Sequence, residues 1–216
     1  MVAKVEFFFD CSSPWTYLAF HAIQPILKET GAEIVWKPIL VGGIFNTVND
    51  TVYQNRQHPN PRKAAYALKD MADWARFHGL RIRMPPTVFP VNSVKCMRGA
   101  FLAIERGRLV EYAYAAFDAY WGDDRDISRD DVMAGIASRA GLDAAELAER
   151  IARPEYKERL KTTTDEAIAR GAFGSPTIFV NGGDMYFGND RLVLVREAIL
   201  RADRRPPAGP QGADRK

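Results

Sequence analysis

The chain has 216 residues and a mass of 24.2 kDa, a size that suits one large domain or one domain with an insertion. Apolar residues make up 47% and charged residues 26%, which is typical of a globular protein and argues against disorder. The formal net charge of +3 comes entirely from the basic excess of residues 201–216, so the neutral body gives no support to nucleic-acid binding.

Other features narrow the class of protein further. The two cysteines, Cys11 and Cys96, form no CxxC pair and lie in no Cys/His cluster, so we expect no metal site. No apolar run is long enough to span a bilayer, and the first residues resemble a strand rather than a signal peptide. We therefore expect a cytoplasmic protein that contacts neither membrane nor nucleic acid and keeps both thiols reduced.

The chain begins with a predicted β-α-β unit. Residues 5–9 are almost wholly apolar, as in a central strand that is buried on both faces. Pro14 opens a predicted helix that ends at Gly31, with Ser13 near its N-cap. Residues 32–39 form the second predicted strand, and the helical crossover is long enough for parallel pairing.

The middle of the chain is predicted to be helical. Residues 40–62 read as a loop because they contain several glycines, asparagines and prolines. Residues 63–171 then show helical spacing of apolar side chains, with helix starts predicted at Ser93, at Pro154 and at two capping boxes, Ser128 with Asp131 and Asp143 with Glu146.

Strand character returns near the C-terminus. Residues 176–180 and 184–187 flank Asn181-Gly182-Gly183, which is a hairpin signal, and a last helix follows Asp190. We expect an α/β protein with a thioredoxin-like fold: residues 1–62 and 172–201 form that domain, 63–171 are a large α-helical insertion, and 202–216 are a disordered tail.

In this arrangement the reactive group lies where the first strand meets the first helix. Ser13 and Thr16 stand in a Ser-Pro-x-Thr frame where a redox enzyme would have two cysteines, so dithiol exchange is excluded there. What remains is a helix N-terminus that favours an anion, with a hydroxyl able to donate to a thiolate. The alternative is that Ser13 is only a helix cap.

Two further motifs support a site at this point. Ser175-Pro176 enters the third strand, and either marks a strand boundary or exposes backbone groups to an extended peptide. Asn189 and Asp190 precede the last helix, and are either caps or contacts for the charged end of a ligand.

Together these motifs resemble the 2-hydroxychromene-2-carboxylate isomerase family, which is related to kappa-class glutathione transferases within the DsbA-like group. The resemblance extends over residues 5–200 and is carried by FFFDCSSPWTYLA at 7–19, LVGGIFNTVND at 40–50, PRKAAY at 61–66, FPVNS at 89–93, GAFGSPTIFV at 171–180 and FGNDRL at 187–192. It implies a DsbA-like architecture, bound glutathione as cofactor, a small aromatic carboxylate as substrate and a homodimer.

The resemblance also implies roles for individual residues. Ser13 faces the glutathione sulfur as the catalytic residue. The other glutathione contacts implied are Asn49, Lys63, Ser175, Pro176, Gly188, Asn189, Asp190 and Arg191. Substrate contacts are expected from Asn92 and Arg98 as donors and from Trp15 and Phe45 as aromatic walls, although Arg98 alternatively lies on a solvated helix face and the rings in the core.

Three enzymatic hypotheses follow. The first is a glutathione-dependent isomerase that adds and then expels the thiolate, converting 2-hydroxychromene-2-carboxylate-type substrates to trans-o-hydroxybenzylidenepyruvate-type products. The second is a glutathione transferase that releases a stable conjugate. The third is a thiol enzyme based on Cys11, which competes with an inert buried thiol. A non-enzymatic glutathione- or peptide-binding module is the remaining alternative.

Overall fold

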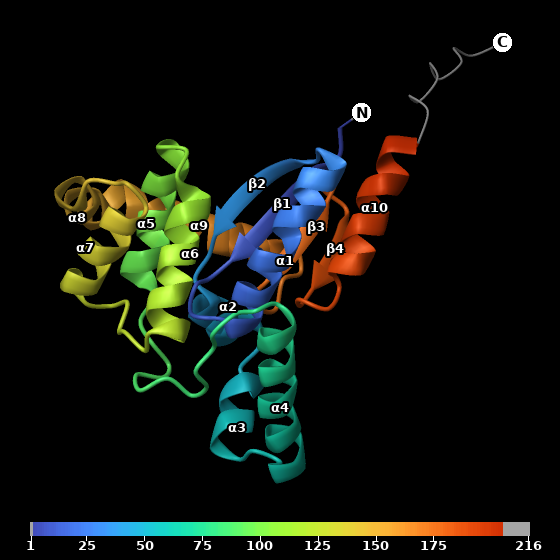
Figure 1. Cartoon of the computed structure of the whole chain (residues 1–216), viewed down its shortest axis with the longest axis horizontal. Coiled ribbons are helices and arrows are strands. Elements are labelled where there is room, and N and C mark those ends of the chain that lie inside the picture. The colour runs from blue at the N-terminus through green and yellow to red at the C-terminus, as the bar shows by residue number, and fades with distance from the viewer. Residues whose placement is uncertain (1, 205–216) are drawn as a thin grey trace.

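The computed structural model describes residues 2–204, which form a four-stranded mixed sheet surrounded by helices (Figure 1). The strand order is β2-β1-β3-β4; β1 and β2 are parallel, whereas β3 is antiparallel to both β1 and β4. The strands are β1 (Lys4–Phe9), β2 (Glu33–Pro38), β3 (Thr177–Val180) and β4 (Asp184–Phe187).

Helices connect and cover these strands. Those packed around the sheet are α1 (Pro14–Thr30), α2 (Val41–Val48), α9 (Pro154–Ala169) and α10 (Leu192–Arg204), while α3 (Thr51–Gln57) and α4 (Pro61–Phe77) extend away from it (Figure 1). A further group comprises α5 (Val94–Glu105), α6 (Leu109–Phe117), the π-helical turn η1 (Asp118–Gly122), α7 (Asp130–Arg139) and α8 (Ala144–Ala152). No helix within residues 2–204 is both long and apolar enough to cross a bilayer.

The apolar run of β1 is explained by burial on both faces of the sheet. Phe7 and Phe9 pack in the larger core, with α1, α5, α6 and α10, while Phe8 faces a smaller core formed with α2, α9 and Phe179. All three rings of β1 are fully buried, and each contributes about 2 kcal/mol of hydrophobic stabilisation. The prediction that residues 5–9 form a central strand is therefore confirmed.

Several predicted helix ends are confirmed by the structure. Ser13 is the N-cap of α1, and Gly31 ends that helix in the left-handed conformation, at φ 67°. Asp143 caps α8 by accepting a hydrogen bond from the Glu146 backbone N–H at 2.8 Å. The box predicted at Ser128 and Asp131 is wrong, because α7 begins at Asp130 after an N-cap at Arg129 without a side-chain bond.

The loop predicted over residues 40–62 is also wrong, since α2 and α3 lie within it. The start of α2 has no local side-chain cap; instead, the distant Thr164 hydroxyl accepts from the Leu40 N–H at 3.0 Å, and Asp10 accepts from the Val41 N–H at 2.9 Å. Ile44 then packs into the smaller core. These long-range contacts stabilise a helix of low intrinsic propensity, which local sequence does not reveal.

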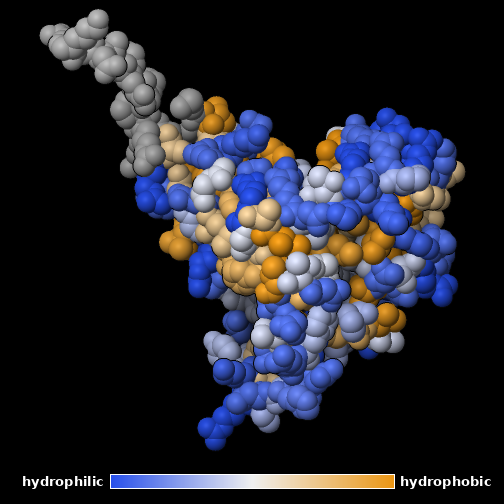
Figure 2. Space-filling view, turned by 180° about the vertical axis from the view of Figure 1, so that it is seen from behind, coloured by the Kyte–Doolittle hydropathy of each residue, from blue (hydrophilic) through white to orange (hydrophobic). Residues whose placement is uncertain are grey.

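Two outer parts of the molecule complete the fold. The pair α3 and α4 projects from the body, and in the view from behind its surface is largely hydrophilic, whereas apolar side chains gather across the middle of the molecule (Figures 1 and 2). At the C-terminus α10 extends to Arg204, so residues 202–204 are helical rather than part of a tail. The remainder of the predicted tail lies outside the described residues.

Candidate functional site

A buried carboxylate organises the end of β1. Asp10 has no exposed surface, and its Oδ1 accepts from the Ser12 N–H at 2.9 Å. Its Oδ2 accepts from the Val41 N–H at 2.9 Å and from the Ser93 hydroxyl at 3.0 Å. Burial raises the pKa of Asp10 despite these donors. This single side chain therefore joins the β1–α1 turn to the starts of α2 and α5, a role that the sequence analysis did not assign.

Ser13 is held between the first helix and the segment before β3. Its hydroxyl oxygen accepts from the Thr16 N–H at 3.2 Å, and its O–H donates to the Ser175 carbonyl at 3.0 Å. The side chain is thus a helix cap, and its one proton is already engaged. To donate to a bound thiolate, the hydroxyl must rotate away from Ser175.

The two motifs predicted to meet are indeed in contact. The Thr16 and Ser175 hydroxyl oxygens lie 2.7 Å apart, and the Asp10 backbone N–H donates to the Ser175 hydroxyl at 3.0 Å. The Ser175–Pro176 peptide bond is cis. The start of α1 and the loop before β3 therefore form one hydrogen-bonded unit.

Some backbone donors at this unit have no partner in the described part of the chain. Those nearest the Ser13 cap are the N–H of Trp15, in the first turn of α1, and the N–H of Ser175. Pro14 has no N–H to offer, so the Trp15 donor carries the exposed positive end of the helix dipole. A free donor at a helix start and another at a strand entry suit a ligand with an anionic group and a peptide-like backbone.

The β4–α10 turn lies next to the same loop, because the Gly188 N–H donates to the Pro176 carbonyl at 3.3 Å. The Asn189 side chain is only 7% exposed, and its Nδ2 finds no hydrogen-bond partner among residues 2–204. A buried amide without an acceptor costs free energy unless a ligand satisfies it. Asp190, by contrast, is half-exposed and paired with Arg191 at 2.5 Å.

Of the remaining predicted glutathione contacts, Asn49 lies near the loop before β3 and Lys63 lies far from it. The Asn49 side-chain amide donates to the Phe173 carbonyl at 2.9 Å, which places the end of α2 beside the loop that leads to Ser175. Lys63 lies in the first turn of α4, at the end that projects farthest from the sheet (Figure 1). The structure does not bring the Lys63 side chain into contact with the other predicted residues.

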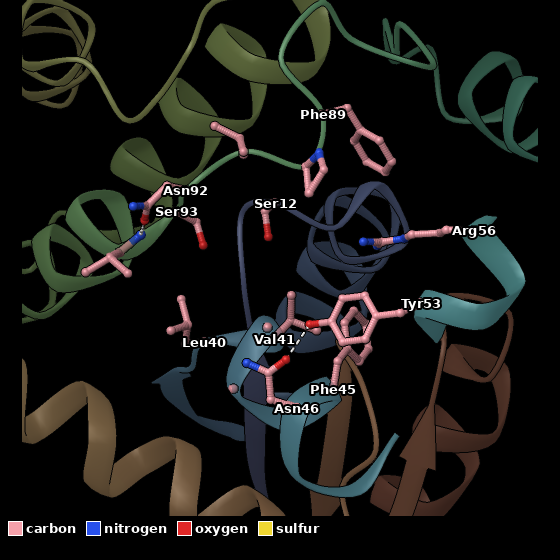
Figure 3. Close-up of a pocket in the computed structure, with 15 residues that line it drawn as sticks. Ser12, Leu40, Val41, Phe45, Asn46, Tyr53, Arg56, Phe89, Asn92 and Ser93 are labelled. Carbon is pink, nitrogen blue, oxygen red and sulfur yellow. Dashed lines mark hydrogen bonds between the residues drawn. The ribbon is translucent and has the colours of Figure 1, made fainter. Parts of the chain in front are cut away.

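A cavity of about 320 Å³ opens beside Ser12, between α2, α3 and the segment before α5 (Figure 3). Of the residues expected to contact a substrate, Phe45 and Asn92 line it, whereas Trp15 does not. The other lining residues are Ser12, Leu40, Val41, Gly42, Gly43, Asn46, Tyr53, Arg56, Phe89, Pro90, Val91, Ser93 and Val94.

Arg98 does not reach this cavity. It lies one helical turn beyond the start of α5, where its guanidinium donates to the Ile151 carbonyl at 3.2 Å. Its Nε is buried and has no partner within residues 2–204. The prediction of a substrate-binding Arg98 is therefore corrected: the side chain contacts the end of α8, because the helix turns it toward α8.

Tyr53 and Arg56 are two of the lining residues that the sequence did not reveal. Both come from α3, which was expected to be a loop, and their spacing of three places them on one helix face. That spacing of a ring and a guanidinium was the available signal. In a segment predicted to be a loop, a spacing of three places no two side chains on a common face.

Cys11 lies beneath the site and is fully buried. Its N–H contacts the Met97 sulfur at 3.3 Å, and its carbonyl accepts from the Trp121 indole N–H at 2.9 Å. Burial and the adjacent Cys96 raise the pKa of the Cys11 thiol well above its ordinary value. The thiol therefore stays protonated at neutral pH, which disfavours a nucleophilic Cys11.

The fold and the site together define a class of protein. The family model of the DsbA-like thioredoxin domain matches residues 4–200, and the chain belongs to that family. Its site carries serine and threonine in place of the paired cysteines expected of a dithiol oxidoreductase.

Within this family, individual proteins of known name are similar to the chain over most of its length. A 2-hydroxychromene-2-carboxylate isomerase from Pseudomonas sp. (strain C18) is 28% identical over 201 residues, covering 92% of this chain and 91% of the relative. Human glutathione S-transferase kappa 1 is 29% identical over 211 residues and covers 90% of each chain. A solved structure of 2-hydroxychromene-2-carboxylate isomerase superimposes with a TM-score of 0.77 at 26% identity, covering 93% of this chain and 96% of that one.

Proposed function

We propose that this protein is a glutathione-dependent isomerase of 2-hydroxychromene-2-carboxylate-type substrates, forming trans-o-hydroxybenzylidenepyruvate-type products. The relatives named as isomerases support the reaction type, and those named as kappa transferases support glutathione as the thiol. The observation that carries the proposal is the group of unpaired donors around Ser13, above all the buried Asn189 amide.

The residues present fit glutathione, which is an extended tripeptide with an anionic group at each end. The free Ser175 N–H offers a backbone donor for its central residue, and the Asn189 Nδ2 offers a donor for its γ-glutamyl end. Gly188 lets the chain make this turn, because any other residue would need an unfavourable φ of +99° and its side chain would begin 3.0 Å from the Asp190 carboxylate. When bound, glutathione would supply a thiolate that adds reversibly to a conjugated enone and so permits rotation about the former double bond.

The chain's own groups stabilise negative charge beside α1. The Trp15 N–H and the helix dipole favour an anion at this point, and the Ser13 hydroxyl can exchange its bond to the Ser175 carbonyl for one to that anion. Because the Thr16 N–H bond uses only a lone pair of the Ser13 oxygen, this rotation leaves the helix cap in place.

The cavity beside Ser12 is the proposed position of the aromatic substrate. Ser12 belongs to the same turn as Ser13, so a substrate in the cavity lies next to the group that handles the sulfur. Phe45 and Phe89 provide apolar walls, and Asn92 provides an amide (Figure 3). Substrate and thiol are thereby held side by side, which lowers the entropic part of the barrier.

Turnover of 2-hydroxychromene-2-carboxylate with and without glutathione tests the proposal. We expect conversion only with glutathione, an isomeric product and full recovery of free thiol. Equal turnover without glutathione would contradict the proposal. Loss of free thiol with a stable conjugate would assign the same site to a transferase instead.

The proposal includes a homodimer, as the family resemblance predicts. Tyr66 and Phe77 on the projecting α4 are 65% and 76% exposed, and a second copy of the chain would cover such apolar surface. We expect light scattering to give twice the mass of one chain, and a purely monomeric protein would refute this part of the proposal.

A further inference from the structure

The cavity contains one charged side chain, Arg56, among its lining residues. Its guanidinium carbon lies 5.2 Å from the centroid of the Phe89 ring and 5.8 Å from that of Phe45. Figure 3 shows the guanidinium end directed into the cavity, toward the side where Ser12 lies. A positive group is thus held by aromatic faces at the mouth of an otherwise uncharged cavity.

Arg56 has no anionic partner in the described part of the chain. Neither an ion pair nor a hydrogen bond joins it to residues 2–204, whereas Arg170, for example, is bound to Glu6 at 2.8 Å. All the donors of the Arg56 guanidinium are therefore available. A planar guanidinium with free donors binds carboxylates in a two-bond geometry that lysine does not reproduce.

The walls of the cavity select a flat ligand. Phe45 and Tyr53 stand perpendicular, at 90° with centroids 6.3 Å apart, and the Tyr53 hydroxyl donates to the Asn46 side chain at 2.7 Å. That bond fixes the Tyr53 ring. A volume of about 320 Å³ lies at the small end of ligand-binding pockets, which suits a ligand of one or two rings.

We propose that Arg56 is a specificity-determining residue that binds the carboxylate of planar aromatic acids in this cavity. The acid group lies on the guanidinium, the ring lies against Phe45, Tyr53 and Phe89, and the opposite end of the molecule points toward Ser12. This inference rests on the proposed function for the identity of the reaction, but the binding of an aromatic acid does not need turnover.

Binding of trans-cinnamate and of its uncharged amide to the glutathione-free protein, measured by calorimetry, tests the inference. The two probes share one flat shape and differ in charge. We expect wild-type protein to bind the acid about tenfold more tightly than the amide, since one charge-assisted contact contributes about 1.4 kcal/mol. Arg56→Gln removes this preference, while Arg56→Lys restores part of it. Arg62→Gln, an exposed arginine in α4 outside the cavity, is the matched control and leaves the preference intact.

Three results would overturn the inference. They are equal binding of acid and amide by wild-type protein, an acid affinity that Arg56→Gln does not change, and a loss of glutathione affinity in Arg56→Gln with unchanged acid binding. The last result would assign Arg56 to a glutathione carboxylate. If the acid preference depends on Arg56 but no glutathione-dependent turnover is found, the cavity assignment stands and the proposed function fails.

Discussion

The two sides of the β1–α1 turn differ in how their polar groups are satisfied. On the buried side, Asp10, Ser13, Thr16 and Ser175 bind one another through bonds of 2.7–3.2 Å. On the open side, the cavity beside Ser12 is walled by rings, and its Arg56 has no anionic partner within residues 2–204.

This difference separates the residues that hold the geometry of the site from the groups that are free to bind a ligand. A fully bonded buried network holds its members in one geometry, because each broken bond leaves an unsatisfied group. Free donors beside such a network are already placed for a ligand and lose little entropy on binding it. The Trp15 N–H, the Ser175 N–H and the Asn189 amide are free donors of this kind at the edge of the network.

The strongest perturbation of the buried side is Asp10→Ala. It removes the acceptor of three hydrogen bonds, so we expect the free energy of unfolding to fall by about 3 kcal/mol or more. Chemical denaturation measures this loss. Ser93→Ala removes one of the three donors and should cost about 1 kcal/mol. If the two variants lose equal stability, the Asp10 network is not what holds this turn.

The ionisation of Asp10 gives this network a pH dependence. Because burial raises its pKa, the folded protein holds this proton more tightly than the unfolded chain. The resulting stability is fully present below the unfolded pKa of about 3.9 and is lost as the pH rises through the folded pKa. The stability of wild-type protein relative to Asp10→Asn should therefore decline from acidic to neutral pH in denaturation at several pH values. An increase in this relative stability from acidic to neutral pH would contradict a raised pKa of Asp10.

Ser13 lies where the two sides meet. Its role as a helix cap and its role as a hydrogen-bond donor can be tested separately. Ser13→Ala loses both, whereas Ser13→Gly keeps most of the helix stability because glycine is tolerated as an N-cap. We expect both variants to lose about 10-fold to 100-fold in glutathione-dependent kcat/KM, as expected for a lost bond to a charged group. If Ser13→Gly keeps wild-type kinetics, Ser13 is a cap and nothing more.

The Asn189 amide is a donor for which residues 2–204 provide no acceptor. Asn189→Ala should leave the free energy of unfolding nearly unchanged, because no protein bond to Nδ2 is lost. Its dissociation constant for glutathione should rise about tenfold in calorimetric titration. A large loss of stability with unchanged glutathione affinity would show that Asn189 stabilises the fold and does not bind glutathione.

The smallest effect is expected at Cys11. Cys11→Ala removes a buried thiol that stays protonated, so it should cost about 1 kcal/mol of stability and leave glutathione-dependent kcat/KM unchanged. Steady-state kinetics decide this point. Abolished turnover in a variant that remains folded would revive the thiol-enzyme hypothesis.

Except for the role of Asp10, the buried side could be predicted from the sequence because local signals mark it. An apolar strand, Ser13-Pro14 at a helix start and Ser175-Pro176 at a strand start each have local meaning, and the thioredoxin-like order brings them together. The open side was predicted only in part: Phe45 and Asn92 were expected to contact a substrate and do line the cavity, but the helices that form it were not expected. Its helix α2 depends on acceptors from Asp10 and Thr164, which are distant in the chain, and α3 has neither a side-chain cap nor a buried residue that would mark it as a helix. Arg98 was misplaced for a similar reason, because its direction depends on packing against α8.

The ionisation of glutathione on the protein tests the central claim most directly. Ultraviolet titration of the thiolate, with the protein saturated by glutathione, gives the pKa of the bound thiol. The account predicts a value below that of the free thiol, about 8.5, with a return toward it in Ser13→Gly. Saturable binding with an unshifted thiol pKa would contradict the claim that the start of α1 stabilises a thiolate.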